Sequence, residues 1–211
     1  MNTADKFHEL IFLGGPPGVG KSTLAKELVE IDTTTQQIGA GDLIRDVRAG
    51  FRHSKYTGII QEAISKKELV PPEVFSGLIH EGIQQADIEV SLSLIDGFPY
   101  SELDWNTFVE QMKETEVSIK GFVALNASLE LCVDRMEQRG VRGGERVRVL
   151  QDEKSHDFFV RRYDEYSRKK ELIVDIFMRS GVPIVDIDAS RSGDEISEVF
   201  RTTIQSLRKD K

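Results

Sequence analysis

The residues with the clearest chemistry lie in the segment 14–23, GGPPGVGKST. Gly15, Gly20, Lys21 and Ser22 match the pattern G-x-x-x-x-G-K-[ST], in which several backbone N–H groups converge on one anion. In this pattern the lysine reaches the outer phosphates of a nucleotide, and the hydroxyl group after it binds Mg²⁺. The segment therefore predicts a site for ATP and Mg²⁺, formed by Gly15, Pro16, Pro17, Gly18, Val19, Gly20, Lys21, Ser22 and Thr23.

The flanks of this segment agree with a phosphate-binding loop. Residues 10–13 form a short apolar run that ends at glycines, which is typical of a buried parallel strand. Residues 21–31 have apolar side chains at helical spacing, so the loop leads into a helix whose positive end faces the phosphates. Because a phosphate loop lies between a strand and a helix, a chance match in a glycine-rich turn is the weaker interpretation.

Asp96 is the second candidate for phosphate chemistry. It follows the apolar run 92–95, where a parallel α/β sheet presents the edge that binds ligands. A carboxylate there can hold Mg²⁺ directly or through water. An aspartate in a turn or at a helix cap is the alternative, and the phosphate loop favours the metal. We predict Ser22 and Asp96 as the metal-binding residues.

The remaining pattern alternates strands with helices. Two more buried strands are predicted at 122–125 and 183–187, and helical patterns follow the later strands at 102–116, 128–138 and 193–208. This alternation predicts an α/β fold in which helices cover both faces of a central parallel sheet, giving three layers.

Two stretches interrupt the alternation. Residues 41–87 have helical periodicity, no convincing strand and the sequence VPPE at 70–73 between helices. Residues 139–155 are rich in Gly and Arg and poor in core residues, which is typical of a flap. We expect one domain, 1–211, that carries both stretches as insertions.

Composition limits the classes of function. The formal net charge of −8 argues against a nucleic-acid-binding protein, although local arginines can still bind an anionic small molecule. The single cysteine, Cys132, excludes an intrachain disulfide and is expected to be a buried thiol. No apolar run approaches the ~20 residues of a membrane span, and no signal peptide is recognised. We expect a cytoplasmic protein that uses ATP and has no membrane partner.

Beyond the loop, ordered motifs cover most of the chain. They are IGAGDLIRD at 38–46, ELVPPEV at 68–74, LIDGFPY at 94–100, ALNASLELCVDRMEQRG at 124–140 and FVRRYDEY at 159–166. In this order they resemble the adenylate kinase-like nucleoside monophosphate kinases. The resemblance implies a P-loop kinase core, an acceptor-binding insertion at about 41–87 and a lid at about 139–155. We expect a monomer. The resemblance also implies transfer of the γ-phosphoryl group of ATP to a nucleoside monophosphate.

The resemblance further implies roles for particular residues. Arg45 would hold the acceptor phosphate, while Arg139 and Arg162 would close on the transferring group, because guanidinium groups grip phosphate through two donors. Arg146 or Arg148 would be the lid arginine, and Arg161 could exchange roles with Arg162. With Lys21 and Asp96, the catalytic set is Lys21, Arg45, Asp96, Arg139 and Arg162; the acceptor site would also include Ala40, Gly41, Leu69, Val70 and Gly97.

The chain departs from the family after Asp-Gly-Phe-Pro. Tyr100 replaces an arginine that grips the acceptor phosphate, a loss of about 1.5–3 kcal/mol unless Arg48, Arg52 or another cation compensates. Asp104 replaces a glutamine that reads adenine, and a carboxylate only accepts hydrogen bonds, so it would suit guanine or cytosine. Ser22 and Ala40 are smaller departures. The family resemblance makes AMP the expected acceptor. Tyr100 and Asp104 are the positions that decide which nucleoside monophosphate is preferred.

Three other functions stay open. Another small-molecule P-loop kinase would share the fold and differ in its acceptor. A nucleotide-dependent switch or ATPase would hydrolyse ATP without an acceptor. A kinase-like nucleotide-binding module would bind ATP and transfer nothing, which the presence of Lys21, Asp96, Arg139 and Arg162 disfavours.

Overall fold

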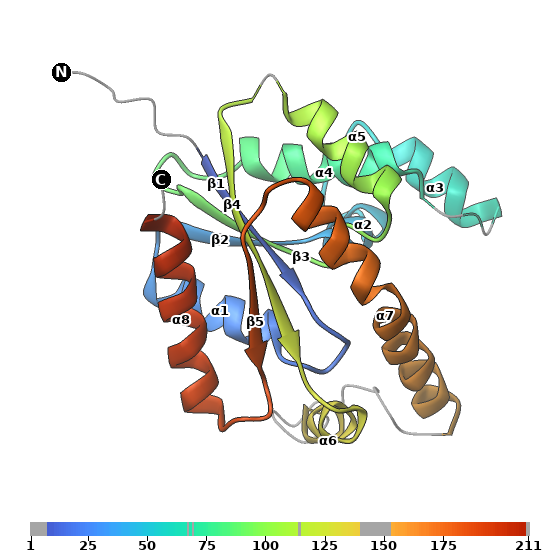
Figure 1. Ribbon diagram of the computed structural model, residues 1–211. Coiled ribbons are helices and arrows are strands. Elements are labelled where there is room, and N and C mark those ends of the chain that lie inside the picture. Colours follow the sequence, from blue (N-terminus) through green and yellow to red (C-terminus); the bar gives the residue numbers. More distant parts are fainter. Residues whose placement is uncertain (1–7, 67, 69, 114, 140–152, 210–211) are drawn as a thin grey trace.

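The computed structural model describes residues 8–66, 68, 70–113, 115–139 and 153–209 (Figure 1). Five strands form the sheet: β1 (His8–Gly14), β2 (Thr35–Gly39), β3 (Leu92–Asp96), β4 (Val117–Asn126) and β5 (Ile184–Asp188). The helices are α1 (Lys21–Ile31), α2 (Ala40–Ala49), α3 (Thr57–Lys66), α4 (Pro72–Gln84), α5 (Glu102–Met112), α6 (Leu129–Arg139), α7 (Glu153–Arg179) and α8 (Gly193–Lys209). Among the helices of the described residues, none is long and apolar enough to cross a membrane.

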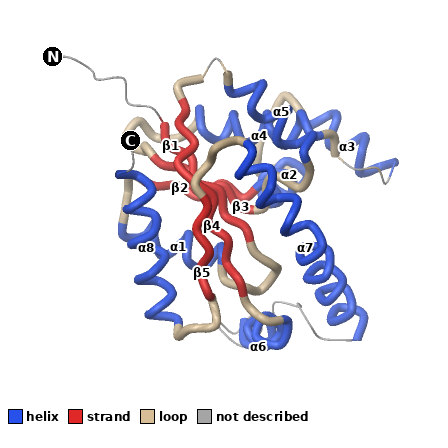
Figure 2. The backbone as a smooth tube through the Cα atoms, in the orientation of Figure 1, coloured by secondary structure: helices blue, strands red, loops and turns tan. Residues whose placement is uncertain are grey.

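The sheet is parallel throughout, in the order β2-β3-β1-β4-β5, and helices lie on both of its faces (Figures 1 and 2). Successive side chains of a strand point to opposite faces. Leu10 and Phe12 accordingly belong to the core under α2, α4, α5 and α7, and Ile11 and Leu13 belong to the core under α1, α6 and α8. The predicted three-layer α/β fold is confirmed.

Strand β2 is absent from the sequence prediction. Its sequence, TQQIG, has no apolar run, and only Thr35 and Ile38 are buried. Hydrogen-bonded pairing with β3 makes it a strand despite this composition. The strand leads directly into α2, and the insertion then contains three helices.

The parallel register brings the carboxyl ends of three strands together. Leu13 of β1 and Gly39 of β2 both lie opposite Asp96 of β3. The phosphate loop, the start of α2 and the segment after Asp96 therefore share one edge of the sheet. This edge is where the sequence predicts the ligand site.

The 27-residue helix α7 lies across from this edge of the sheet. Its C-terminal half is anchored in the core, where the rings of Phe122 and Phe177 stack with centroids 4.4 Å apart. Trp105 packs edge-on against Phe177 and donates a hydrogen bond from Nε1 to Ser180 Oγ at 2.8 Å. The anchored half holds the rest of the helix at a fixed place beside the sheet edge.

Candidate active site

The phosphate loop connects β1 to α1 and has the backbone geometry of an anion cradle. Gly20 is the N-cap of α1 and has a φ of 114°, so the helix begins at Lys21. Gly18 has a φ of +79°, and a Cβ atom on it would lie 2.6 Å from the carbonyl oxygen of Cys132. Only glycine fits there, because another side chain would be strained and would collide with α6. Cys132 itself is buried, as predicted.

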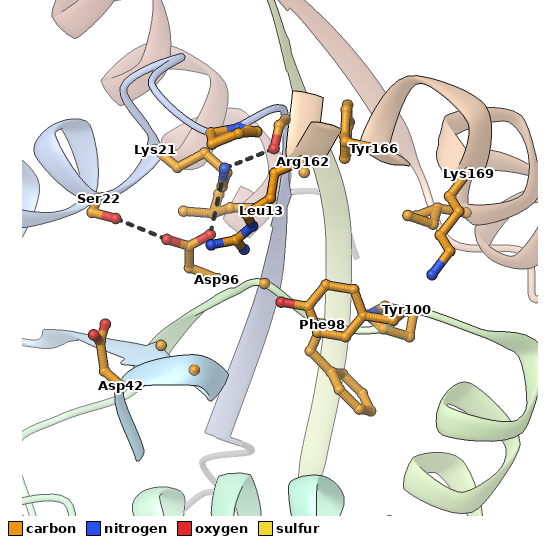
Figure 3. A pocket seen from close by; sticks show the side chains of 18 of the residues that line it. Leu13, Lys21, Ser22, Asp42, Asp96, Phe98, Tyr100, Arg162, Tyr166 and Lys169 are labelled. Carbon is orange, nitrogen blue, oxygen red and sulfur yellow. Dashed lines mark hydrogen bonds and ion pairs between the residues drawn. The ribbon is translucent and has the colours of Figure 1, made fainter. Parts of the chain in front are cut away.

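The side chain of Lys21 folds back along the phosphate loop. Its ammonium group donates hydrogen bonds to the carbonyl oxygens of Gly15, at 2.7 Å, and Pro16, at 3.2 Å. It also lies 3.9 Å from Asp96 Oδ1 (Figure 3). A cation held at the mouth of the loop is well placed to meet the outer phosphates of a nucleotide.

Ser22 and Asp96 are adjacent, as predicted for a metal pair. Ser22 Oγ donates a hydrogen bond to Asp96 Oδ2 at 2.9 Å. A hydroxyl and a carboxylate are hard oxygen ligands that suit Mg²⁺, which usually takes one or two protein ligands, substrate phosphates and water. In the described part of the chain, no group of three or more His, Cys, Asp or Glu residues could hold a metal. The donor set therefore fits Mg²⁺ bound jointly with phosphates.

A cavity of about 270 Å³ opens between the phosphate loop, α2, the segment after β3 and α7 (Figure 3). Many of the predicted site residues line it: Gly15, Pro17, Lys21, Ser22, Gly41, Arg45, Asp96, Gly97, Tyr100 and Arg162. The structure thus brings the predicted ATP-binding and acceptor-binding residues to one space.

Arg45 and Arg162 reach this cavity from two different helices, α2 and α7. Arg45, on α2, pairs with the Asp42 carboxylate one helical turn before it, and both side chains are largely exposed. Arg162 comes from α7, and its charge acts on the Tyr100 hydroxyl. Two guanidinium groups facing one space can hold two phosphoryl groups, or one that moves between partners.

The other predicted residues lie elsewhere. Gly18, Val19, Gly20 and Thr23 line a second cavity, on the other side of the phosphate loop. Ala40 is buried in the core, and Val70 packs against that core; neither lines either cavity. Pro16 lines neither cavity and contributes its carbonyl group to Lys21. Leu69, Arg146 and Arg148 lie outside the described residues, as does the side chain of Arg139, the last residue of α6.

Asp104 does not line the cavity, contrary to the sequence prediction. Only 7% of the residue is exposed, and its carboxylate Oδ2 accepts a hydrogen bond from the backbone N–H of Tyr100 at 3.0 Å. Its own N–H donates to Ser101 Oγ, the N-cap of α5, at 3.1 Å. The two hydrogen bonds resemble a capping box, except that the Asp104 side chain accepts from Tyr100, one residue before the N-cap. Asp104 therefore holds the Tyr100 backbone in place, and its burial outside the cavity keeps its carboxylate away from a ligand bound there.

Tyr100 does line the cavity. Burial raises the pKa of its hydroxyl above the usual value, and the nearby Asp96 and Asp104 carboxylates act in the same direction, while Arg162 opposes them. The hydroxyl is therefore protonated at neutral pH and available as a hydrogen-bond donor.

Sequence reasoning missed four lining residues on α7; one of them is the apolar Ile173. Glu165, Tyr166 and Lys169 lie three, four and seven positions after Arg162, and all four residues line the cavity. This spacing places all four on one face of a helix. Burial also raises the pKa of Tyr166 far above its ordinary value. The helical spacing from Arg162 was the signal that could have found them.

Another missed residue, Arg135, adjoins the phosphate loop. Its guanidinium group donates to the carbonyl oxygens of Val19 at 2.9 Å and Ala189 at 2.7 Å. It also lines the second cavity, of about 330 Å³, with Thr23, Gln138 and Ile196. Arg135 thus ties the loop to the segment between β5 and α8 and presents a planar cation to that cavity.

Comparisons with known proteins agree with this geometry. The family model described as "Adenylate kinase" matches residues 13–182. The chain is 28% identical over 208 residues to the UMP-CMP kinase of Danio rerio, covering 96% of this chain and 98% of the relative. It is 30% identical over 207 residues to the UMP-CMP kinase of Gallus gallus, covering 95% and 97%. It is also 26% identical over 216 residues to the adenylate kinase of Streptococcus equi, covering 94% and 99%.

Proposed function

Because the chain belongs to the adenylate kinase family and is a phosphotransferase, we propose that it transfers the γ-phosphoryl group of ATP to a nucleoside monophosphate. One observation carries this proposal. A single cavity is lined by the phosphate-loop residues Lys21 and Ser22 on one side and by Arg45 and Arg162 on others. A site for ATP alone would not need the second set of cations.

Phosphoryl transfer requires alignment and neutralisation of charge more than covalent chemistry. In the proposed reaction the loop N–H groups and Lys21 hold the β- and γ-phosphates of ATP. Ser22 and Asp96 would hold Mg²⁺, which would neutralise part of the negative charge of the phosphates. Arg162 stabilises the transferring group, and Arg45 holds the acceptor phosphate so that its oxygen faces the γ-phosphorus.

The second cavity is the proposed place for the nucleoside part of ATP. It adjoins Gly18 and Gly20 of the phosphate loop, so a nucleotide with its phosphates in the loop can extend into it. The Arg135 guanidinium group is planar and can stack on a base. The acceptor then occupies the first cavity, and its phosphate meets that of ATP at Lys21.

The identity of the acceptor base is tested by comparing AMP, CMP and UMP. AMP is the prediction from the family resemblance, whereas the relatives reported above include proteins named UMP-CMP kinases. Asp104 gives no support for a preference for cytosine or guanine, because it is buried and does not line the cavity. A monomer acting in the cytoplasm, where ATP is abundant, completes the proposal.

Two variants test the assignment of roles. Lys21→Met should abolish transfer while leaving the fold intact. Arg162→Ala should lower kcat by roughly 100-fold or more, with a much smaller change in ATP binding, because it acts on charge that develops in the transition state. A near-normal kcat for Arg162→Ala would transfer that role to Arg161. Rapid ATP hydrolysis by the unaltered protein without an acceptor would instead favour an ATPase.

A further inference from the structure

The second cavity contains a carboxylate to which the proposed function assigns no role. Among the described residues that line this cavity, Glu27 of α1 is the only one with a negative charge. An ionised carboxylate accepts hydrogen bonds and donates none. It repels the phosphates of a nucleotide, so its partner in a bound nucleotide must be an N–H or O–H group of the nucleoside.

We propose that Glu27 accepts a hydrogen bond from the exocyclic amino group of the donor base, and so selects ATP over donors with a carbonyl oxygen at that position. This inference rests on the proposed function, which places the nucleoside part of the phosphoryl donor in the second cavity. It goes further by naming the residue that determines which base is accepted there. Ser197 of α8 positions the carboxylate.

The contact between Glu27 and Ser197 joins two helices that line the cavity. Ser197 Oγ lies 2.7 Å from Glu27 Oε2 and 2.9 Å from the carbonyl oxygen of Gly193. A hydroxyl group has one proton, and a carboxylate is the stronger of these two acceptors, so we assign the proton to Glu27. The helices α1 and α8 cover the same face of the sheet and share one buried core (Figure 1). The carboxylate is thus held in place before a ligand binds.

The Glu27 carboxylate keeps acceptor capacity for a ligand. A carboxylate has about four lone-pair sites, and the contact with Ser197 uses one of them. Within the described part of the chain, no other residue donates a hydrogen bond to the Glu27 side chain or forms an ion pair with it. The carboxylate can therefore accept a hydrogen bond from a base without losing Ser197.

The position of Glu27 along the cavity matches the base rather than the ribose. Helix α1 begins at Lys21, so Glu27 lies about 9 Å from its start along the axis. Thr23 lines the cavity one turn nearer the phosphate loop. The ribose is bonded directly to the α-phosphate and must lie near the loop, whereas the base is the part of the nucleotide that reaches furthest from it. Glu27 is therefore placed at the far edge of the base.

The rest of the lining suits the faces of a flat ring. Leu24 of α1 and Ile196 of α8 are buried apolar residues that line the cavity. The Arg135 guanidinium group is fixed by hydrogen bonds to two backbone carbonyl groups. A base can stack on a planar guanidinium group and lie against aliphatic side chains. Such contacts accept any base, so the contact to its edge is the one that selects.

The charge of Glu27 determines which purine fits. Adenine carries an amino group at C6, which donates to a carboxylate, whereas hypoxanthine and guanine carry a carbonyl oxygen there, which a carboxylate repels. A site that hydrogen-bonds one group of a ligand rejects an analogue that lacks it. Glu27 is exposed when no ligand is bound, so we expect discrimination of about 10-fold rather than several orders of magnitude.

The test uses three triphosphates that differ at one position of the purine. ATP has the amino group at C6, purine riboside triphosphate has hydrogen, and inosine triphosphate (ITP) has a carbonyl oxygen. Calorimetric titration with Mg²⁺ and without an acceptor makes the result independent of transfer. The parent protein should bind ATP about 10-fold more tightly than either analogue. Glu27→Gln offers an amide N–H₂ to a carbonyl oxygen, so it should bind ITP and ATP within about 3-fold of each other.

Two further variants separate selection from a structural role. Glu30→Gln should keep the parent's preference, because Glu30 is an exposed glutamate of the same helix that lines neither cavity. Ser197→Ala should reduce the preference for ATP to about 3-fold, since the carboxylate is then held less firmly. An unchanged preference in Glu27→Gln, or equal weakening of all three triphosphates, would overturn this inference alone.

Two more outcomes concern the contact atom and the reaction. If Glu27→Gln weakened ATP but not 2′-deoxy-ATP, the contact would belong to the ribose, and the inference would be wrong. Transfer to AMP, CMP and UMP is then measured with each triphosphate as donor. If no donor supported transfer to any acceptor, the proposed function and this inference would both fall.

Discussion

Asp104 is the residue at which an experiment can best distinguish a role in reading a base from a role in stabilising the fold. Its carboxylate lies in the first turn of α5 and accepts the Tyr100 N–H, while the residue is only 7% exposed. We predict that Asp104→Ala destabilises the protein and displaces Tyr100 without changing the order of preference among acceptors.

The magnitude follows from the hydrogen bond that is lost. A hydrogen bond to a charged acceptor contributes about 1.5–3 kcal/mol, and the half-buried Tyr100 N–H would lose its partner. For a chain of this size, 1 kcal/mol corresponds to roughly 2–4 °C in Tm, so Asp104→Ala should lower Tm by roughly 3–12 °C. Asp104→Asn retains an acceptor oxygen and should lose about half as much.

The assay joins urea unfolding with kcat/KM for AMP, CMP, UMP and GMP. We expect a lower free energy of unfolding, and a KM that rises by a similar factor for every acceptor because displacing Tyr100 alters the cavity lining without changing a group that reads the base. The reasoning is refuted if Asp104→Ala has the stability of the parent protein while its preference shifts from one base to another.

Three further predictions concern the loop, the metal pair and pH. Gly18→Ala should disrupt nucleotide binding and lower Tm, since its Cβ would lie 2.6 Å from a carbonyl oxygen, whereas Gly58→Ala, with open space around it, should not; dye-monitored melting with and without ATP compares them. Ser22→Ala should raise the Mg²⁺ concentration needed for half-maximal transfer, measured by metal titration at saturating ATP, and an unchanged requirement would remove Ser22 from the metal site. Burial lowers the pKa of His8 below 6.5, so the folded chain binds this proton less tightly than the unfolded chain. Stability from neutral His8 is present above about pH 6.5 and is lost as the pH falls through the lower folded pKa, so His8→Gln should give a shallower decline in unfolding free energy at mildly acidic pH; an identical slope would contradict it.

The sequence was sufficient for the parts of the fold that depend on apolar runs and on one strong motif. Residues 10–13 and 92–95 were recognised as buried strands because they are continuously apolar, and both lie within strands of the sheet. The sequence TQQIG was not recognised, because β2 owes its conformation to pairing with β3, which no local pattern encodes.

The candidate site likewise contains residues that the sequence predicts and residues that it does not. Lys21, Ser22 and Asp96 were predicted and meet at one edge, because a motif and a strand end fix them in space. Asp104 was misplaced, because the sequence gives its distance along the chain from Tyr100 but not which of its neighbours takes its carboxylate. Lys169 was missed, since its place in the cavity lining depends on α7 facing the phosphate loop across the cavity.

Acceptor-dependent formation of diphosphates tests the central claim most directly. Purified protein is incubated with Mg²⁺ and ATP, alone and with AMP, CMP or UMP, and the nucleotides are separated and quantified over time. The proposed function predicts that ADP appears together with an equal amount of the acceptor's diphosphate, at a rate at least ~100-fold above the rate without acceptor, and that Lys21→Met shows neither. ADP and inorganic phosphate formed at the same rate with and without every acceptor would contradict it.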